Sequence, residues 1–266
     1  MTTLTATPVR SFPLRDTLTM LRRNLRHAQR YPSLTLSGML VPVFMLLLFV
    51  GVFGGALGSG IGGGGDYVNY VTPAIILMAA TSGSVATAIS VSSDMAEGII
   101  NRFRTMAISR SSVLTGHVIG SIMQTIVSVA LVIGVAIAMG FRPNATFVEW
   151  LSVTGILVLL MTALTWISAA IGLVARNPES ASNLPLPFTF LPLLGSGFVP
   201  TESMPGAVRW FAEYQPFTPI NETLRGLLMG TGVGSNAIIA SAWCVGLTVV
   251  GFLWARRAFN ATREQV

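Results

Sequence analysis

Few residues of this chain have side chains that could perform acid–base chemistry or hold a metal ion. The two histidines, His27 and His117, lie far apart, and the one cysteine, Cys244, lies within an apolar run. The sequence has no cluster of metal ligands, nucleophile elbow, pair of catalytic carboxylates or cofactor fingerprint. We therefore predict a chain with no catalytic residue, metal or cofactor of its own. His117 alone is a candidate acid or base, and its place near a loop favours a capping or interfacial role.

One compact charged segment, residues 94–107, lies between two long apolar runs. Asp94 followed by Glu97 has the spacing of a capping box, so we predict that a helix begins there. At about 100° per residue this helix would have an apolar and a polar side. The apolar side would hold Met95, Ala96, Ile99, Ile100, Phe103, Met106 and Ala107, and the polar side Glu97, Gly98, Asn101, Arg102, Arg104 and Thr105. Such a helix needs a cover, for which lipid headgroups, the chain's own helix ends and a soluble partner are the alternatives.

The composition is that of a membrane protein. Of the 266 residues, 52% are hydrophobic and 10% are charged, and the mean hydropathy is +0.70. A soluble domain carries about 25% charged residues, so this composition excludes one. All 16 basic residues are arginines, and they lie in loops between apolar runs rather than in a surface stripe. This distribution argues against a nucleic-acid partner despite a pI near 10.7.

Six apolar runs are long enough to cross a bilayer, which takes about 20 residues for each helix. They cover approximately residues 34–58, 68–92, 113–140, 150–175, 183–200 and 235–255. The fifth is short and contains Pro185, Pro187 and Pro192, so neighbouring helices must satisfy the backbone groups that these prolines free. We predict an all-α integral membrane protein in which one six-span domain, residues 34–266, follows a separate segment, residues 1–33.

The arginines predict how the chain is oriented. Thirteen of them lie in the N-terminal segment, the loops after the second and fourth spans and the C-terminal segment, whereas Arg142, Arg209 and Arg225 lie on the other side. Cytoplasmic loops carry the excess of basic residues. We therefore expect both termini, and the segment of residues 94–107, in the cytoplasm.

Residues 14–30 predict an amphipathic helix before the first span. It would have a leucine stripe on one side and arginines on the other, which is typical of a helix lying in the inner membrane interface. A solvated flank and a brace for a cytoplasmic partner are the alternatives. The stripe is Leu14, Leu18, Leu21 and Leu25, and the arginines are Arg15, Arg22, Arg23, Arg26 and Arg30.

The segment of residues 200–234, on the predicted outer side, is too apolar for an ordinary loop and too broken by proline to span twice. We predict two short helices that lie in, or re-enter, the outer leaflet. Glu222 and Arg225 are three residues apart and are expected to pair on one of them. The segment is either a neutral surface or the lid of a transport path, and its candidate gate residues are Pro216, Pro219, Glu222 and Arg225.

The spans contain essentially no Asp, Glu, Arg or Lys. Ion-coupled transporters place ionisable groups at membrane depth, and the chain also has no nucleotide-binding loop. If it performs uphill transport, a second protein must therefore supply the energy.

Three stretches together resemble the membrane subunit of type-2 ATP-binding-cassette exporters, in particular the daunorubicin-resistance-like permeases of actinobacteria. They are residues 15–32, residues 97–116 and residues 196–228, the last running from Ser196-Gly197-Phe198-Val199-Pro200 through Pro216-Phe217-Thr218-Pro219 to Leu224-Arg225-Gly226. Two positions depart from relatives, Ala107 where a proline is frequent and His117 where a basic residue often follows the glycine.

The resemblance implies a half-transporter in a bacterial plasma membrane. It would pair as a homodimer, or as a heterodimer with a similar permease, and two cytoplasmic ATPase subunits would carry the ATP and Mg. The loop between spans two and three would be a coupling helix seated in the ATPase, and the N-terminal helix with Arg15, Arg22 and Arg26 would also touch it. The coupling residues would be Asp94, Glu97, Gly98, Arg102, Phe103 and Arg104.

The function that this resemblance implies is ATP-driven export of amphiphilic drugs or lipids, as in multidrug efflux and antibiotic resistance, by a chain that is not itself an enzyme. An exporter of polysaccharides or lipid precursors with the same architecture is one alternative. A different class, an intramembrane enzyme or a structural membrane protein, is another, and His117 would be its only candidate catalytic group.

Overall fold

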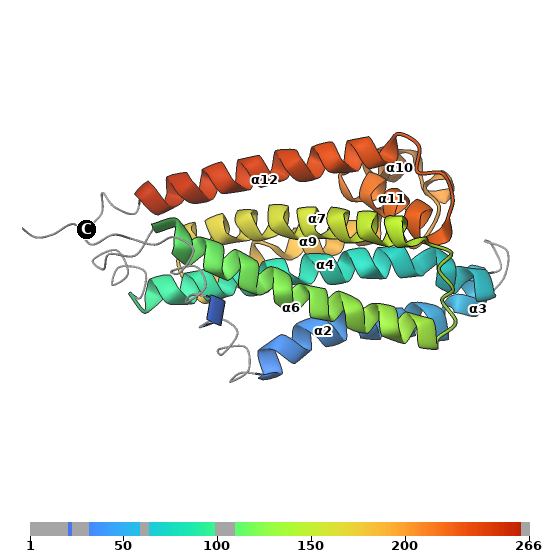
Figure 1. Cartoon of the computed structure of the whole chain (residues 1–266), viewed down its shortest axis with the longest axis horizontal. Helices are drawn as coiled ribbons and strands as arrows, with labels where there is room; N and C mark the ends of the chain where they lie inside the picture. The colour runs from blue at the N-terminus through green and yellow to red at the C-terminus, as the bar shows by residue number, and fades with distance from the viewer. Residues whose placement is uncertain (1–20, 23–31, 59–63, 99–109, 262–266) are drawn as a thin grey trace, which may run out of the picture.

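The structure is a computed structural model that describes residues 21–22, 32–58, 64–98 and 110–261. Within these ranges the chain forms helices and no strand. The helices run lengthwise in a bundle, and two of them, α10 and α11, cross one end (Figure 1). Arg15 and Arg26 of the predicted interfacial helix lie outside the described residues, whereas Arg22 is exposed in a short helical stretch.

Four helices are long and apolar enough to cross a membrane: α4 (Gly64–Ala96), α6 (Arg110–Ala138), α7 (Phe147–Val174) and α12 (Asn236–Ala261). They overlap the runs predicted over residues 68–92, 113–140, 150–175 and 235–255. The first of them begins four residues earlier than predicted and ends four residues later, and α12 continues six residues further.

The first predicted span is helical throughout the described range, but in three pieces. Helix α2 (Pro32–Leu47) continues into the π-helical turn η1 (Leu48–Val52), and α3 (Gly54–Gly58) follows. The wider turn closes through a hydrogen bond from the amide of Phe53 to the carbonyl of Leu48, 3.2 Å long. The π-helical turn contains Gly51, and Gly54 and Gly55 follow it; glycine has the lowest helix propensity after proline, which agrees with the loss of regular helix here.

The fifth predicted span, residues 183–200, is not one helix. The chain forms α8 (Pro178–Asn183), α9 (Leu186–Phe190) and the 3-10 turn η2 (Leu191–Leu194), and it then turns away. Pro185, Pro187 and Pro192 remove the amide donors that one continuous helix would need, and each disfavours helical geometry in the residue before it.

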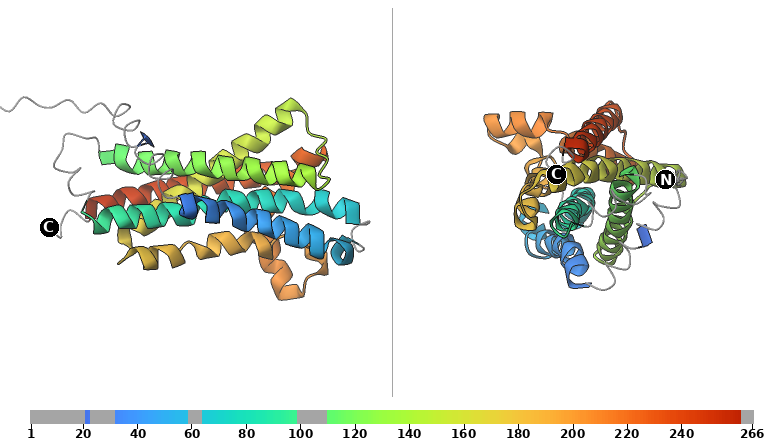
Figure 2. Two further views of the ribbon diagram at one scale, coloured as in Figure 1. Left: turned by 90° about the horizontal axis from the view of Figure 1, so that it is seen from below. Right: turned by 90° about the vertical axis from the view of Figure 1, so that its left-hand side faces the viewer.

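Helix α4 lies at the centre of the bundle and contacts α2, α6, α7, α8 and α9, as the end view of Figure 2 shows. The most apolar windows of α4 and α7 are 67% and 72% buried, whereas those of α6 and α12 are 33% and 17% buried. The outer helices therefore direct long apolar faces away from the bundle, which suits a lipid environment.

Two short helices lie between η2 and α12, as predicted. After the 3-10 turn η3 (Thr201–Ser203), α10 (Gly206–Tyr214) is largely exposed, and α11 (Phe217–Met229) is largely buried. Helix α11 packs against α4, α7 and α12, and its carbonyl at Leu228 accepts a hydrogen bond from Asn144 in the loop before α7. It ends at Gly230, whose φ of +68° favours glycine.

The bundle has two distinct ends (Figure 1). Helices α3, α10 and α11 lie at one end, which we call the α11 end, and α4 finishes at the opposite end, where α6 begins. Arg209 and Arg225 lie on α10 and α11, and Arg142 follows α6 at the same end, whereas Arg256 and Arg257 lie near the finish of α12. This separation agrees with the two sides predicted from the arginines.

Candidate functional site: two polar clusters at opposite ends of the bundle

At the end where α4 finishes, the chain does not begin a new helix at Asp94. Helix α4 continues through Asp94 to Ala96, and the amides of Glu97 and Gly98 bond to the carbonyls of Ser93 and Met95 at 2.9 and 3.0 Å. Gly98 has a φ of +67°, the left-handed conformation that ends a helix. The predicted capping box is therefore wrong, and the segment of residues 94–107 is not one helix.

The carboxylate of Asp94 instead reaches across to α6. Its Oδ2 lies 2.9 Å from Nε2 of His117, and only 9% and 5% of the two side chains are exposed. A carboxylate accepts, so Nε2 donates. The other ring nitrogen, Nδ1, lies 3.2 Å from the hydroxyl of Ser90. The role predicted for His117, capping or reaching the interface, is therefore wrong, because its ring is held between two residues of α4. We call these three residues the Asp94 cluster.

Ser, His and Asp are also the residue types of a hydrolase triad, but this geometry does not suit one. Ser90 contacts Nδ1 and Asp94 contacts Nε2, the reverse of the serine-protease arrangement. Ser90 also lies inside α4, where neighbouring amides are used by the helix and are not available to stabilise an oxyanion. The cluster is built to hold α4 against α6.

The other residues expected to dock a partner are placed only in part. Glu97 is exposed beside Gly98 at the turn that follows α4. Arg102, Phe103 and Arg104 lie outside the described residues. Among the described residues there is no group of three or more His, Cys, Asp or Glu side chains that could hold a metal ion.

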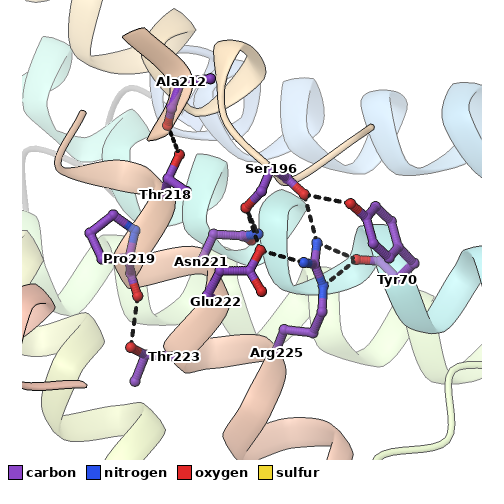
Figure 3. Close-up of polar contacts among 9 residues, drawn as sticks. All are labelled: Tyr70, Ser196, Ala212, Thr218, Pro219, Asn221, Glu222, Thr223 and Arg225. Carbon is purple, nitrogen blue, oxygen red and sulfur yellow. Dashed lines mark hydrogen bonds and ion pairs between the residues drawn. The ribbon is translucent and has the colours of Figure 1, made fainter. Parts of the chain in front are cut away.

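The second cluster lies at the α11 end and centres on Arg225 (Figure 3). Its Nη1 donates to Oε1 of Glu222 at 2.6 Å, which confirms the predicted pair, and 15% of the Arg225 side chain is exposed. Its Nη2 donates to the carbonyl of Ser196 at 2.9 Å, and Nη2 and Nε reach the carbonyl of Tyr70 at 3.3 and 3.4 Å. The guanidinium carbon lies 3.9 Å from the centre of the Tyr70 ring.

Ser196 is the point where these contacts meet. Its hydroxyl donates to Glu222 and accepts from Nδ2 of Asn221 at 3.3 Å, and its carbonyl accepts from the Tyr70 hydroxyl at 2.8 Å. We call Tyr70, Ser196, Asn221, Glu222 and Arg225 the Arg225 cluster. It joins α4, the turn after η2 and α11 through one buried residue.

The four gate candidates have different places around this cluster. Glu222 and Arg225 are its charged members, and 15% of the Arg225 side chain and 31% of the Glu222 side chain are exposed. Pro216 precedes α11, and Pro219 lies in the first turn, where its carbonyl accepts from Thr223 at 2.7 Å. Sequence reasoning missed Ser196 and also Tyr70, whose partners Ser196 and Arg225 lie 126 and 155 residues further along the chain.

Comparison with known proteins connects both clusters to one family. The sequence model described as "ABC-2 type transporter" matches residues 15–229. The chain is 28% identical over 244 residues to the daunorubicin resistance ABC transporter permease protein DrrB1 of Streptomyces coeruleorubidus, which covers 91% of this chain and 82% of that protein. It is 26% identical over 180 residues to the probable doxorubicin resistance ABC transporter permease protein DrrC of Mycobacterium tuberculosis, or 68% of this chain and 65% of that protein. The ABC transporter G family member 20 of Dictyostelium discoideum is 24% identical over 196 residues, or 70% of this chain and 25% of that protein.

Proposed function

Because the chain belongs to the ABC-2 type transporter family, we propose that it is the permease subunit of an ATP-driven exporter of amphiphilic drugs or lipids. The observation that carries this proposal is the similarity, over 91% of the chain, to a permease named for daunorubicin resistance. The four apolar helices of membrane-spanning length, with apolar faces directed outward, support a multi-pass membrane protein.

The energy enters through a separate cytoplasmic ATPase subunit, which carries ATP and Mg. It docks at the segment between α4 and α6, through Glu97, Gly98, Arg102, Phe103 and Arg104, with Asp94 behind them in α4. The N-terminal segment with Arg15, Arg22 and Arg26 lies along the same side of a bacterial plasma membrane, and both termini are cytoplasmic. The excess of arginine on this side supports that orientation.

The transport unit is a dimer of this chain, or of this chain with a similar permease. Each subunit crosses the membrane six times, counting the segment from α2 to α3 and the broken segment from α8 to η2. Helices α10 and α11 form the outer gate, with Pro216 and Pro219 at the start of α11. The Arg225 cluster supports this role, because it joins α11 to α4 through contacts that an opening movement must break.

The test uses the whole complex. A tagged chain, expressed with its genomic neighbours, should co-purify with an ATPase, and inverted membrane vesicles should accumulate daunorubicin when ATP is added. Phe103→Asp should abolish both results, because a charge replaces the apolar side chain expected at the contact. Phe147→Asp is the matched control, since Phe147 is 84% exposed at the opposite end of the bundle. Absence of an ATPase, or normal accumulation with Phe103→Asp, would contradict the proposal.

A further inference from the structure

The Asp94 cluster is one end of a longer row of polar residues between α4 and α6. On α4 the row is Gly83, Thr87, Ser90 and Asp94, and on α6 it is His117, Ser121 and Thr125. The spacings of three and four residues place each set on one face of its helix. We call these seven residues the polar seam.

Members of the seam contact one another across the two helices. The hydroxyl of Ser121 donates to the carbonyl of Gly83 at 3.0 Å and accepts from the hydroxyl of Thr87 at 2.7 Å. His117 then contacts Ser90 and Asp94, one and two turns further along α4. Thr87, Asp94, His117 and Thr125 are all buried. Four contacts between polar groups therefore join the two helices, whereas the hydroxyl of Thr125 donates to the carbonyl of Ser121 within α6.

The helices also approach each other closely at Gly83, within the seam. A β-carbon at Gly83 would lie 2.1 Å from Oγ1 of Thr125 and 3.1 Å from Oγ of Ser121. Small residues at such a contact allow two helices to pack closely in a membrane. A slide of one helix along the other would lose the hydrogen bonds and move a side chain into this gap.

The hydrogen bonds between its own residues distinguish the polar seam from the wall of a transport path. Residues that line a path direct their polar groups into it, whereas Thr87, Ser90, Asp94, His117 and Ser121 direct theirs at the neighbouring helix. When the helices separate, these interhelical hydrogen bonds are lost in a medium that offers no water to replace them. The seam therefore favours one fixed arrangement of α4 and α6.

We propose that the polar seam makes α4 and α6 one rigid hairpin, and that His117 and Asp94 are positioning residues that fix the base of the docking segment between them. This inference rests on the proposed function. The partner would push on residues 97–109, which connect α4 to α6. This push moves the two helices as one body only if they are held together where the connecting segment begins and ends. Without the Asp94–His117 contact, fewer molecules would be exported for each ATP hydrolysed.

The first experiment locks the seam. In a Cys244→Ser background, Thr87→Cys and Ser121→Cys place two thiols where oxygen atoms lie 2.7 Å apart, so that oxidation can close a disulfide across the helices. A rigid hairpin predicts that the oxidised transporter exports daunorubicin within about twofold of the reduced transporter, the usual spread of uncoupled changes. Loss of export on oxidation, with recovery on reduction, would show that the helices slide and would overturn the proposal.

The second experiment tests the positioning residues through the number of molecules exported for each ATP hydrolysed. His117→Leu removes the donor to Asp94 and should lower this ratio about tenfold, the size of one lost hydrogen bond to a charged group. His117→Gln keeps an N–H donor and should restore most of it. ATPase co-purification with each variant is the separate check on the proposed function. Equal ratios in the parent and both variants, or an equal loss in both, would overturn the role of the pair.

Discussion

Gly172 of α7 lies so close to α4 that a β-carbon there would be 2.6 Å from the carbonyl oxygen of Ala88 and 2.9 Å from the β-carbon of Val91. The first of these atoms belongs to the backbone of a central helix, so it cannot turn aside as a flexible side chain would. The absence of a side chain at Gly172 therefore sets the distance between the two most buried long helices.

Gly172→Ala should destabilise the folded protein by about 1–3 kcal/mol, the usual cost of forcing an extra methyl group into a packed core. Thermal unfolding in detergent would show this as a lower midpoint and a smaller yield of monodisperse protein. Gly155→Ala is the matched control, because Gly155 lies on the same helix and nothing lies within 4 Å of a β-carbon built there. Equal stability of the two variants would contradict the close packing of α4 and α7.

Arg225→Gln should destabilise the protein by about 2 kcal/mol, because the carboxylate of Glu222 loses its charged partner and the carbonyls of Tyr70 and Ser196 each lose a donor. It should also raise the rate at which an outer-side probe reaches a cysteine introduced in α11. Arg209→Gln breaks the other described Arg–Glu pair, which is exposed on α10, and should change little. If both variants behave alike in unfolding and labelling, the Arg225 cluster does not hold α11.

Removal of the hydroxyl should change the free energy of unfolding differently at two neighbouring tyrosines of α4, Tyr67 and Tyr70. Tyr70→Phe loses the 2.8 Å bond to Ser196 and should cost about 1 kcal/mol in the free energy of unfolding. The hydroxyl of Tyr67 is buried with no hydrogen-bond partner among the described residues. Tyr67→Phe should therefore be neutral or stabilising. A larger loss for Tyr67→Phe in the same unfolding assay would reverse this assignment.

Gly98→Ala should weaken the turn that ends α4 by about 1 kcal/mol, because residues other than glycine disfavour the φ of +67° found there. Nothing lies within 4 Å of a β-carbon at this position, so the effect is one of backbone conformation alone. Gly98→Asn should be milder, since asparagine adopts this conformation more readily. Thermal unfolding of the two variants in detergent would measure both effects, and equal destabilisation by alanine and asparagine would contradict a role for the backbone conformation.

The sequence pattern predicts those parts of the fold that depend only on residues close together in the chain. A run of more than 20 apolar residues satisfies its own backbone as a helix, and α4, α6, α7 and α12 follow from that requirement. The fifth predicted span differs because three prolines interrupt its helix. The presence of these prolines does not indicate at which residue the chain turns away. The pair of Glu222 and Arg225 was predictable because the two residues are neighbours on one helix.

The sequence pattern could not predict side-chain contacts between residues that are distant in the chain. Asp94 and Glu97 have the spacing of a capping box, yet the same spacing occurs where a long helix ends, and only His117, 23 residues later, distinguishes the two cases. No local signal indicates that the carbonyl of Tyr70 receives Arg225, which lies 155 residues further along the chain. The polar seam is a further case, because no local pattern indicates that Gly83 and Thr87 of α4 contact Ser121 of α6.

The Arg225 cluster also has an electrical consequence. Glu222 and Arg225 carry opposite unit charges and contact each other at 2.6 Å, so any displacement of α11 that keeps them together carries no net charge through the membrane field. Moving one elementary charge across 100 mV is worth about 2.3 kcal/mol, and a neutral pair gains none of this. A membrane voltage therefore does no net work on the charges of this pair, and the rate of such a movement should be the same in polarised and depolarised vesicles.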